Sequence, residues 1–203
     1  MIMNRGLGKL TPKGSALLLC DMQEKFRNII SYGPAVIKVV QRMLTFADQL
    51  EIPVLVTEHY PKGLGNTMKE LNVSKYKIFT KTQFSMLVPD VEKHLQSLSV
   101  KSAVICGIES HACVLQTVLD LIEKRYEVHV VVDAVTSRSM VDRMYSLKRM
   151  SEAGAFLTTS ESLFFLWCRD ALHPKFKVLQ KVIMTPAPDS GLLSRLPYFP
   201  QKE

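Results

Sequence analysis

Three side chains able to catalyse hydrolysis end or follow strand-like segments of the sequence. Asp21 ends one apolar run, Lys81 ends another, and Cys113 lies six residues beyond Gly107, where a further run stops. In an open α/β sheet, ligands bind outside the carboxyl ends of the strands. We therefore expect an acid, a cation and a thiol to meet at that edge of a sheet.

Together these residues predict nucleophilic catalysis by the thiol. The nucleophilic form of cysteine is the thiolate, which a helix N-terminus and a neighbouring cation both favour. A helical pattern is under way by Val114, so Cys113 has the helix end, and Lys81 supplies the cation. Asp21 can accept the thiol proton and later pass it to a leaving group, while Lys81 keeps Asp21 ionised.

The surrounding sequence alternates between short apolar runs and helical patterns. Strands are predicted at residues 15–21, 52–59, 75–81, 102–107, 127–134 and 154–160. Helical patterns cover residues 36–47, 89–98, 112–125, 161–170 and 174–184, and Ser139 is positioned to cap one more helix with Asp142. This alternation predicts an α/β protein with three α/β/α layers, Rossmann-like, around a six-stranded parallel sheet. We expect the strand order 3-2-1-4-5-6.

The chain of 203 residues has the length of one well-buried domain. We assign residues 15–184 to that domain, residues 1–14 to a short N-terminal arm, and residues 185–203 to an irregular tail. The longest uninterrupted apolar run has only six residues, at 163–168, so we expect no contact with a membrane interior.

Charge and cysteine usage narrow the class of protein further. The net charge is +7, but the basic residues are spread along the chain, so we expect no nucleic-acid partner. The four cysteines form no CxxC pair and no zinc spacing, which favours a reduced, cytoplasmic protein. The first 20 residues lack acids and carry Arg5, Lys9 and Lys13, a weak likeness to a mitochondrial presequence that leaves mitochondria as the alternative location.

Several segments resemble motifs of the isochorismatase-like cysteine hydrolases. They read LLLCDMQEKF, FTKTQFSM, CGIESHAC and VVVDAVTSRSMVDR, and the later GAFLTTSE, HPKFKVLQK and PAPDSGLL are similar too. The resemblance covers about residues 15–193. It implies the isochorismatase-like hydrolase fold, an Asp–Lys–Cys triad at Asp21, Lys81 and Cys113, a pocket aromatic at Phe26, and a homo-oligomer.

The sequence departs from this group at a metal-binding element. Nicotinamidases, which belong to the group, carry an Asp-x-His element after the second strand that helps to hold a metal. Here the segment reads TEHYPKG, so Glu58 and His59 are adjacent and the element is missing. We therefore expect no metal and no other cofactor, and we interpret Glu58 and His59 as surface polar residues, with a metal role as the alternative.

The resemblance also concerns the joint between the predicted strand at 102–107 and the following helix, which covers residues Ile108 to Cys113. In the family, the peptide bond that leads into the residue four before the cysteine is cis, which corresponds here to the Ile108–Glu109 bond. The resemblance implies that the backbone N–H groups of Glu109 and Cys113 form an oxyanion hole that faces the substrate carbonyl oxygen.

The leading hypothesis is a cysteine hydrolase that acts on a small amide-like or carbamoyl substrate through a thioester. A thiol favours acyl chemistry, because enzymes specialised for the vinyl ether of isochorismate do not depend on one. We expect the substrate to be a small, partly apolar molecule that contacts Phe26, Tyr60, Phe84 and His111. The alternative is a non-catalytic interaction protein that retains the fold and the pocket. A nucleic-acid enzyme ranks last, because no phosphate-binding glycine pattern is present.

Overall fold

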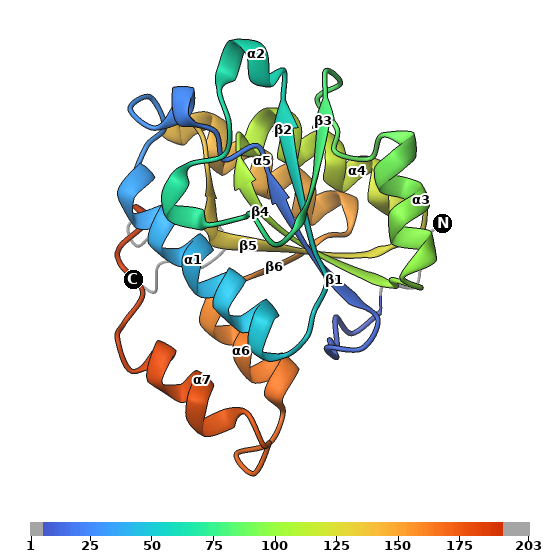
Figure 1. Cartoon of the computed structure of the whole chain (residues 1–203), viewed down its shortest axis with the longest axis vertical. Coiled ribbons are helices and arrows are strands. Elements are labelled where there is room, and N and C mark those ends of the chain that lie inside the picture. Colours follow the sequence, from blue (N-terminus) through green and yellow to red (C-terminus); the bar gives the residue numbers. More distant parts are fainter. Residues whose placement is uncertain (1–5, 193–203) are drawn as a thin grey trace, which may run out of the picture.

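The computed structural model describes residues 6–192, which form one parallel sheet covered by helices (Figure 1). The strands are β1 (Ser15–Cys20), β2 (Val54–His59), β3 (Lys77–Lys81), β4 (Ser102–Ile108), β5 (Glu127–Thr136) and β6 (Phe156–Thr158). The helices are α1 (Gly33–Gln49), α2 (Pro61–Leu64), α3 (Pro89–Ser97), α4 (Leu115–Glu123), α5 (Met140–Ala153), α6 (Ser160–Cys168) and α7 (Phe176–Ile183). Short 3₁₀ turns cover Glu24–Phe26 and Lys69–Leu71, and a π-helical turn covers Ser110–Val114.

The six strands lie in the order β3-β2-β1-β4-β5-β6, and every neighbouring pair is parallel. This arrangement confirms the predicted fold class and strand order. The register pairs Cys20 with Gly107 and His59 with Lys81. The carboxyl ends of β1, β2, β3 and β4 therefore reach the same edge of the sheet.

Each face of the sheet carries its own apolar core. Helices α1, α6 and α7 contribute to the core on one face, with Phe46, Phe164 and Trp167 among its largest side chains. Helices α3, α4 and α5 contribute to the core on the other face, around Leu18, Ile105 and Val130. All six residues of β1 are buried, which agrees with its central place between two helical layers.

The predicted elements differ from the observed ones mainly at their ends. The predicted cap is present, since the Ser139 hydroxyl accepts a hydrogen bond of 3.3 Å from the Asp142 N–H. Strand β5 continues two residues beyond the predicted end, to Thr136, and β6 is shorter than predicted. Residues 185–192 contain no helix or strand, whereas residues 1–5 and 193–203 of the predicted arm and tail lie outside the described residues. Among residues 6–192, no helix is long and apolar enough to cross a membrane.

Gly107 allows β4 to approach β1 at the edge where the candidate site lies. Its φ is +117°, a conformation that L side chains rarely adopt. A Cβ atom at this position would lie 2.1 Å from the carbonyl oxygen of Cys20. Because Gly107 has no side chain, β4 can lie this close to β1. The close contact lies directly before Asp21 on one strand and before the segment that leads to Cys113 on the other.

Replacing Gly107 with alanine should lower the free energy of unfolding by about 3 kcal/mol or more, because it adds a backbone clash to an unfavourable φ. Gly154 is a matched control, since its φ is +114° and nothing lies within 4 Å of a Cβ built there. We expect Gly154→Ala to cost only about 1–2 kcal/mol. Urea unfolding of both variants measures the difference, and equal costs would show that the contact with Cys20 does not matter.

Candidate active site

Asp21 follows the last residue of the central strand and is almost fully buried. Its side chain accepts two hydrogen bonds, one of 2.7 Å from the Thr57 hydroxyl and one of 2.6 Å from the Lys81 ammonium. Its φ of +46° is left-handed, a conformation that Asp and Asn tolerate better than most residues. The backbone thus turns at the strand end and holds the carboxylate inside the protein.

Lys81 reaches Asp21 from β3 although β2 lies between their strands. The Lys81 side chain is fully buried, and its ammonium also donates to the carbonyl oxygens of Gln83 at 3.1 Å and Phe84 at 2.9 Å. The loop after β3 therefore curls back over the strand ends, as the strand order requires. Three acceptors match the three N–H bonds of an ammonium, so the position of the charge is well defined.

The surroundings keep Lys81 in its charged form. Burial by itself would lower the pKa of the Lys81 ammonium, but the electrostatic interactions with Cys20, Asp21 and Cys113 outweigh burial and raise the pKa. The ammonium and the Asp21 carboxylate lie 2.6 Å apart and form a buried ion pair. A buried ion pair of this kind gains most when its remaining hydrogen-bonding groups are satisfied, as they are here.

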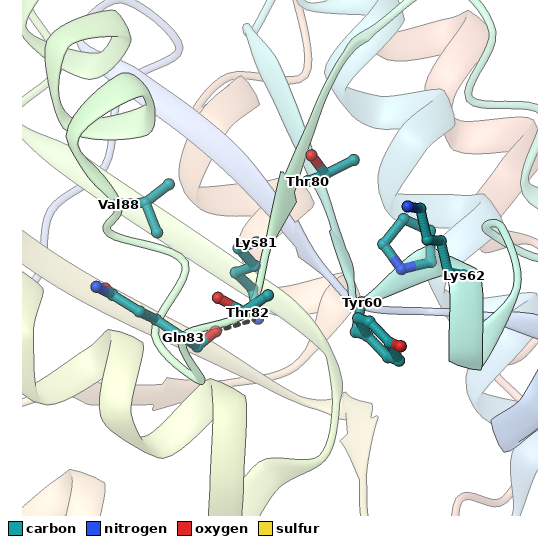
Figure 2. A pocket seen from close by; sticks show the side chains of 8 residues that line it. Tyr60, Lys62, Thr80, Lys81, Thr82, Gln83 and Val88 are labelled. Carbon is teal, nitrogen blue, oxygen red and sulfur yellow. Dashed lines mark hydrogen bonds between the residues drawn. The ribbon is translucent and has the colours of Figure 1, made fainter.

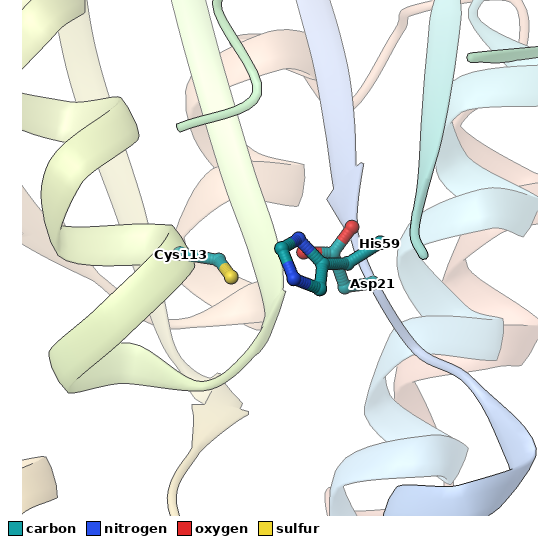
Figure 3. Close-up of side chains that lie close together, drawn as sticks. All are labelled: Asp21, His59 and Cys113. Atoms are coloured by element: carbon teal, nitrogen blue, oxygen red, sulfur yellow. The ribbon is translucent and has the colours of Figure 1, made fainter. Parts of the chain in front are cut away.

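Cys113 lies in the π-helical turn Ser110–Val114, which joins β4 to α4. Its sulfur, a carboxylate oxygen of Asp21 and a ring nitrogen of His59 all lie within 4.8 Å of one another (Figure 3). The Cys113 residue is 8% exposed, so the thiol borders the surface without being freely solvated. The structure thus brings together all three residues of the expected triad, from positions far apart in the sequence.

Cys20 is a second thiol beside Cys113, but it differs in exposure and ionisation. Burial, a hydrogen bond with Cys113 and the charge of Asp21 together raise the pKa of the Cys20 thiol well above its ordinary value. Cys20 is fully buried, at 0% exposure. At neutral pH it therefore remains a protonated thiol within the core, which leaves Cys113 as the candidate nucleophile.

The joint between β4 and the π-helical turn is held from both sides. The Ile108–Glu109 peptide bond is cis. The Glu109 carbonyl accepts hydrogen bonds from the N–H groups of Ala112 at 3.1 Å and Val114 at 3.2 Å. The Glu109 carboxylate accepts two more, from the backbone N–H of Arg138 at 3.0 Å and its guanidinium at 3.1 Å. Arg138, two residues beyond the end of β5, thus binds the side chain of Glu109, the residue directly before the π-helical turn.

Glu58 and His59 lie in surroundings that differ from those predicted from the sequence. The interpretation of Glu58 as a surface residue is wrong, because it is 7% exposed and accepts hydrogen bonds from the Thr67 N–H at 2.7 Å and the Thr67 hydroxyl at 2.9 Å. Adjacent strand residues point to opposite faces of the sheet. His59 accordingly projects on the other side, toward Asp21 and Cys113. The two residues do not form a joint metal site.

Asp133 does not join the candidate site, although the sequence places it at the predicted end of the fifth strand. Strand β5 runs on past it to Thr136. The Asp133 carboxylate instead accepts hydrogen bonds from the N–H group of Ser160 at 2.9 Å and from its hydroxyl at 2.7 Å, at the start of α6. Its role in the structure is to anchor that helix.

The expected substrate-binding residues differ in their contacts and exposure. Phe84 stacks on His59, with ring centroids 5.5 Å apart and planes inclined by 7°. The His111 ring lies 3.0 Å from the Ser137 hydroxyl, on the side where β5 ends. Phe26 is partly buried and packs against the core that contains α1. Tyr60 is more exposed, at 53%.

Tyr60 lines a surface hollow of about 490 Å³ that adjoins the triad. Figure 2 draws the eight side chains around it and labels seven of them: Tyr60, Lys62, Thr80, Lys81, Thr82, Gln83 and Val88. Asp21 and Cys113 do not line this hollow. Lys81 contacts both regions, because it lines the hollow and its ammonium binds Asp21. The hollow therefore lies beside the candidate triad and not around it.

Comparisons with known proteins agree on one family. The family model described as "Isochorismatase domain" matches residues 15–162. Isochorismatase domain-containing protein 2 of Xenopus laevis is 56% identical over 191 residues, which cover 94% of this chain and 93% of the relative. The protein of the same name from Homo sapiens is 52% identical over 188 residues, covering 92% of this chain and 91% of the relative.

A solved structure is similar over nearly the full length as well. The MAR1 ribonuclease from Caenorhabditis elegans superposes with a TM-score of 0.88 at 46% sequence identity. The superposition covers 96% of this chain and 99% of that chain. Both the sequence relatives and this solved structure are thus similar to more than nine-tenths of the chain.

Proposed function

This chain belongs to the isochorismatase domain family, and from that premise we propose that it is a cysteine hydrolase acting on a small amide-like or carbamoyl substrate. The observation that carries the proposal is the buried cluster of Asp21, Lys81 and Cys113, with the Asp21–Lys81 pair at 2.6 Å and the thiol within 4.8 Å of the carboxylate. Binding alone needs no thiol next to a buried ion pair. The cluster therefore favours catalysis over the alternative of a non-catalytic interaction protein.

In the first half of the proposed reaction, the Cys113 sulfur attacks the carbonyl carbon of the substrate. Asp21 takes the thiol proton and then transfers it to the leaving amine, so that ammonia or an amine departs and a thioester remains. Negative charge develops on the carbonyl oxygen during the attack. The backbone N–H groups of Glu109 and Cys113 are the proposed donors to that oxygen, and each donor can lower the barrier by roughly 3–4 kcal/mol.

In the second half, water hydrolyses the thioester. Asp21 takes one proton from the water molecule while the water oxygen attacks the same carbonyl carbon. The carbon–sulfur bond then breaks. The thiolate of Cys113 regains the proton, and the carboxylic acid leaves. Lys81 stays protonated throughout, because its three acceptors and the neighbouring negative charge hold it in that form. The net reaction consumes one water and yields one acid and one amine.

The rim of the site supports a small, partly apolar substrate. Phe84 presents a ring that is 52% exposed, and Tyr60 one that is 53% exposed, so both can cover a bound molecule. We propose that these two rings, together with Phe26 and His111, contact the part of the substrate that does not react. The slight exposure of the Cys113 residue, 8%, favours a substrate whose amide end is slender enough to reach its side chain.

Ammonia release from a panel of small primary amides and carbamoyl compounds tests this function. We expect at least one compound to be hydrolysed by the intact chain and not by the Cys113→Ala variant. Rapid labelling of Cys113 alone by a small alkylating agent at neutral pH would support an activated thiol even before the substrate is known. Absence of both turnover and selective labelling would favour the non-catalytic alternative.

A second candidate function is hydrolysis of RNA. It is favoured by one observation, the 46% identity to a chain described as a ribonuclease. Incubation of the same preparation with RNA separates the candidates, provided that the Asp21→Asn and Cys113→Ala variants are purified identically. RNA cleavage that both variants abolish would favour this function, whereas cleavage that survives in both would indicate a contaminating nuclease.

We further propose that the chain forms a homo-oligomer. Val141 and Tyr145 lie four residues apart on α5, which places them on one face of that helix. They are 64% and 69% exposed, which leaves this apolar face of α5 available to a second copy of the chain. Light scattering of the purified protein determines the number of chains per particle.

A further inference from the structure

We propose that Asp21, His59 and Cys113 form a binding site for Zn²⁺, and that zinc bound there blocks the reaction. The binding itself follows from the geometry of the three side chains. The inhibition rests on the proposed function, because it requires Cys113 to be the nucleophile. Zinc is therefore proposed as a reversible inhibitor and not as a resident cofactor.

The three side chains offer the donor atoms that zinc prefers. A thiolate sulfur, an imidazole nitrogen and a carboxylate oxygen bind Zn²⁺ at about 2.0–2.3 Å, commonly as three protein ligands plus a water. Tetrahedral bonds of that length place ligand atoms about 3.3–3.8 Å apart. The donor atoms of Asp21, His59 and Cys113 lie within 4.8 Å of one another, so movements of about 1 Å bring them into range.

The mixed donor set also selects the type of metal. Mg²⁺ and Ca²⁺ bind oxygen ligands, whereas sulfur and imidazole favour zinc and other thiophilic metals. The ligands come from the end of β1, the end of β2 and the π-helical turn, so three separate parts of the fold hold them. His59 is further restrained, because its ring stacks on Phe84. Figure 3 shows the imidazole together with Cys113 and Asp21 at the strand ends.

The site already accommodates one cation. The Lys81 ammonium lies 2.6 Å from Asp21 and 3.5 Å from the Nδ1 atom of His59, so two of the three donors face a positive charge. Asp21 accepts one hydrogen bond on each oxygen, which leaves a lone pair on each oxygen for a metal.

Charge balance permits zinc beside the lysine. Binding releases the Cys113 thiol proton to solvent and forms a zinc–sulfur bond. Two anions, from Asp21 and Cys113, then offset the lysine and part of the zinc charge, so these groups carry a net charge of only about +1. The sulfur is no longer available to attack a substrate.

Titration of the full-length chain with Zn²⁺ by calorimetry, and with Co²⁺ by absorption spectroscopy, tests the proposal without an activity assay. We expect one ion per chain and a sulfur-to-cobalt charge-transfer band that is lost in Cys113→Ser. His59→Gln should weaken zinc binding by at least about tenfold, because glutamine keeps a similar length but not the imidazole. His173→Gln, in the loop before α7, is the matched control and should bind zinc as the unchanged chain does.

Two results would overturn the site: zinc affinity unaffected by His59→Gln, or a cobalt complex without the thiolate band. The outcome is separable from that of the proposed function. Zinc binding that depends on His59, in a chain that hydrolyses no amide, would leave the metal site intact and remove the function. Amide hydrolysis that depends on Cys113, without zinc binding, would do the reverse.

Discussion

Replacing Cys113 with alanine is expected to lower kcat/KM for the amide substrate on the order of 10⁴-fold or more, with little change in stability. Removal of a nucleophile takes away the covalent route, and the remaining groups supply only part of the acceleration. The thiol lies at the border of the core, so its loss leaves no large cavity. Steady-state kinetics and urea unfolding of the same preparation measure both quantities.

Cys106→Ala is the matched control for this substitution. Cys106 is fully buried in β4, and its sulfur contacts the carbonyl oxygen of Leu18 at 3.8 Å. Its loss should cost about 1–2 kcal/mol of stability, as is usual for a small deletion in a core, and leave kcat within a few-fold. A Cys113→Ala enzyme that remained fully active would show that another group carries the reaction.

The second large effect concerns the buried pair of Asp21 and Lys81. Lys81→Met alone leaves a carboxylate buried without its cation, which should cost about 3–5 kcal/mol of unfolding free energy. Asp21→Asn alone leaves the ammonium without its anion and should be similarly costly. Because an apolar or neutral pair often matches a buried ion pair in stability, the double variant should lose much less than the sum of the two. All three variants should be inactive.

Urea unfolding of the unchanged chain, the two single variants and the double variant gives the coupling energy between Asp21 and Lys81 directly. Asn is suited to position 21, because it tolerates the left-handed φ of +46° and can still accept the hydrogen bond from Thr57. If the costs of the single changes simply added in the double variant, the 2.6 Å contact would not represent a coupled ion pair. Activity recovered in the double variant would contradict the catalytic roles of both residues.

The sequence suffices to predict the fold and the three central residues because both follow from periodicity and position. Short apolar runs alternating with helical patterns specify a parallel sheet. The rule that strand ends share one edge then directs attention to Asp21, Lys81 and Cys113. The motifs that resemble the isochorismatase-like family indicate the same three positions. Neither step requires knowledge of how side chains pack.

The role of His59 could not be predicted in the same way, for a physical reason. Both faces of a parallel sheet are buried, so alternation along β2 does not reveal which face a given residue occupies. The sequence alone therefore does not distinguish Glu58 from His59. In the structure Glu58 accepts a hydrogen bond from Thr67, whereas His59 lies beside Asp21 and Cys113. Asp133 likewise lies within β5, because this strand extends further than its apolar pattern suggests. The partner of each carboxylate is decided by tertiary contacts alone.

The π-helical turn Ser110–Val114 has a consequence for how related genes can be compared. A π turn closes over one residue more than an α turn, and deletion of one residue rotates everything before it by about 100° relative to the helix. A homologue with a single-residue gap in this segment would thus keep a cysteine in its alignment while aiming the sulfur elsewhere. Gap placement between Ile108 and Leu115, more than the presence of the cysteine, then indicates whether a homologue keeps its sulfur beside the strand ends.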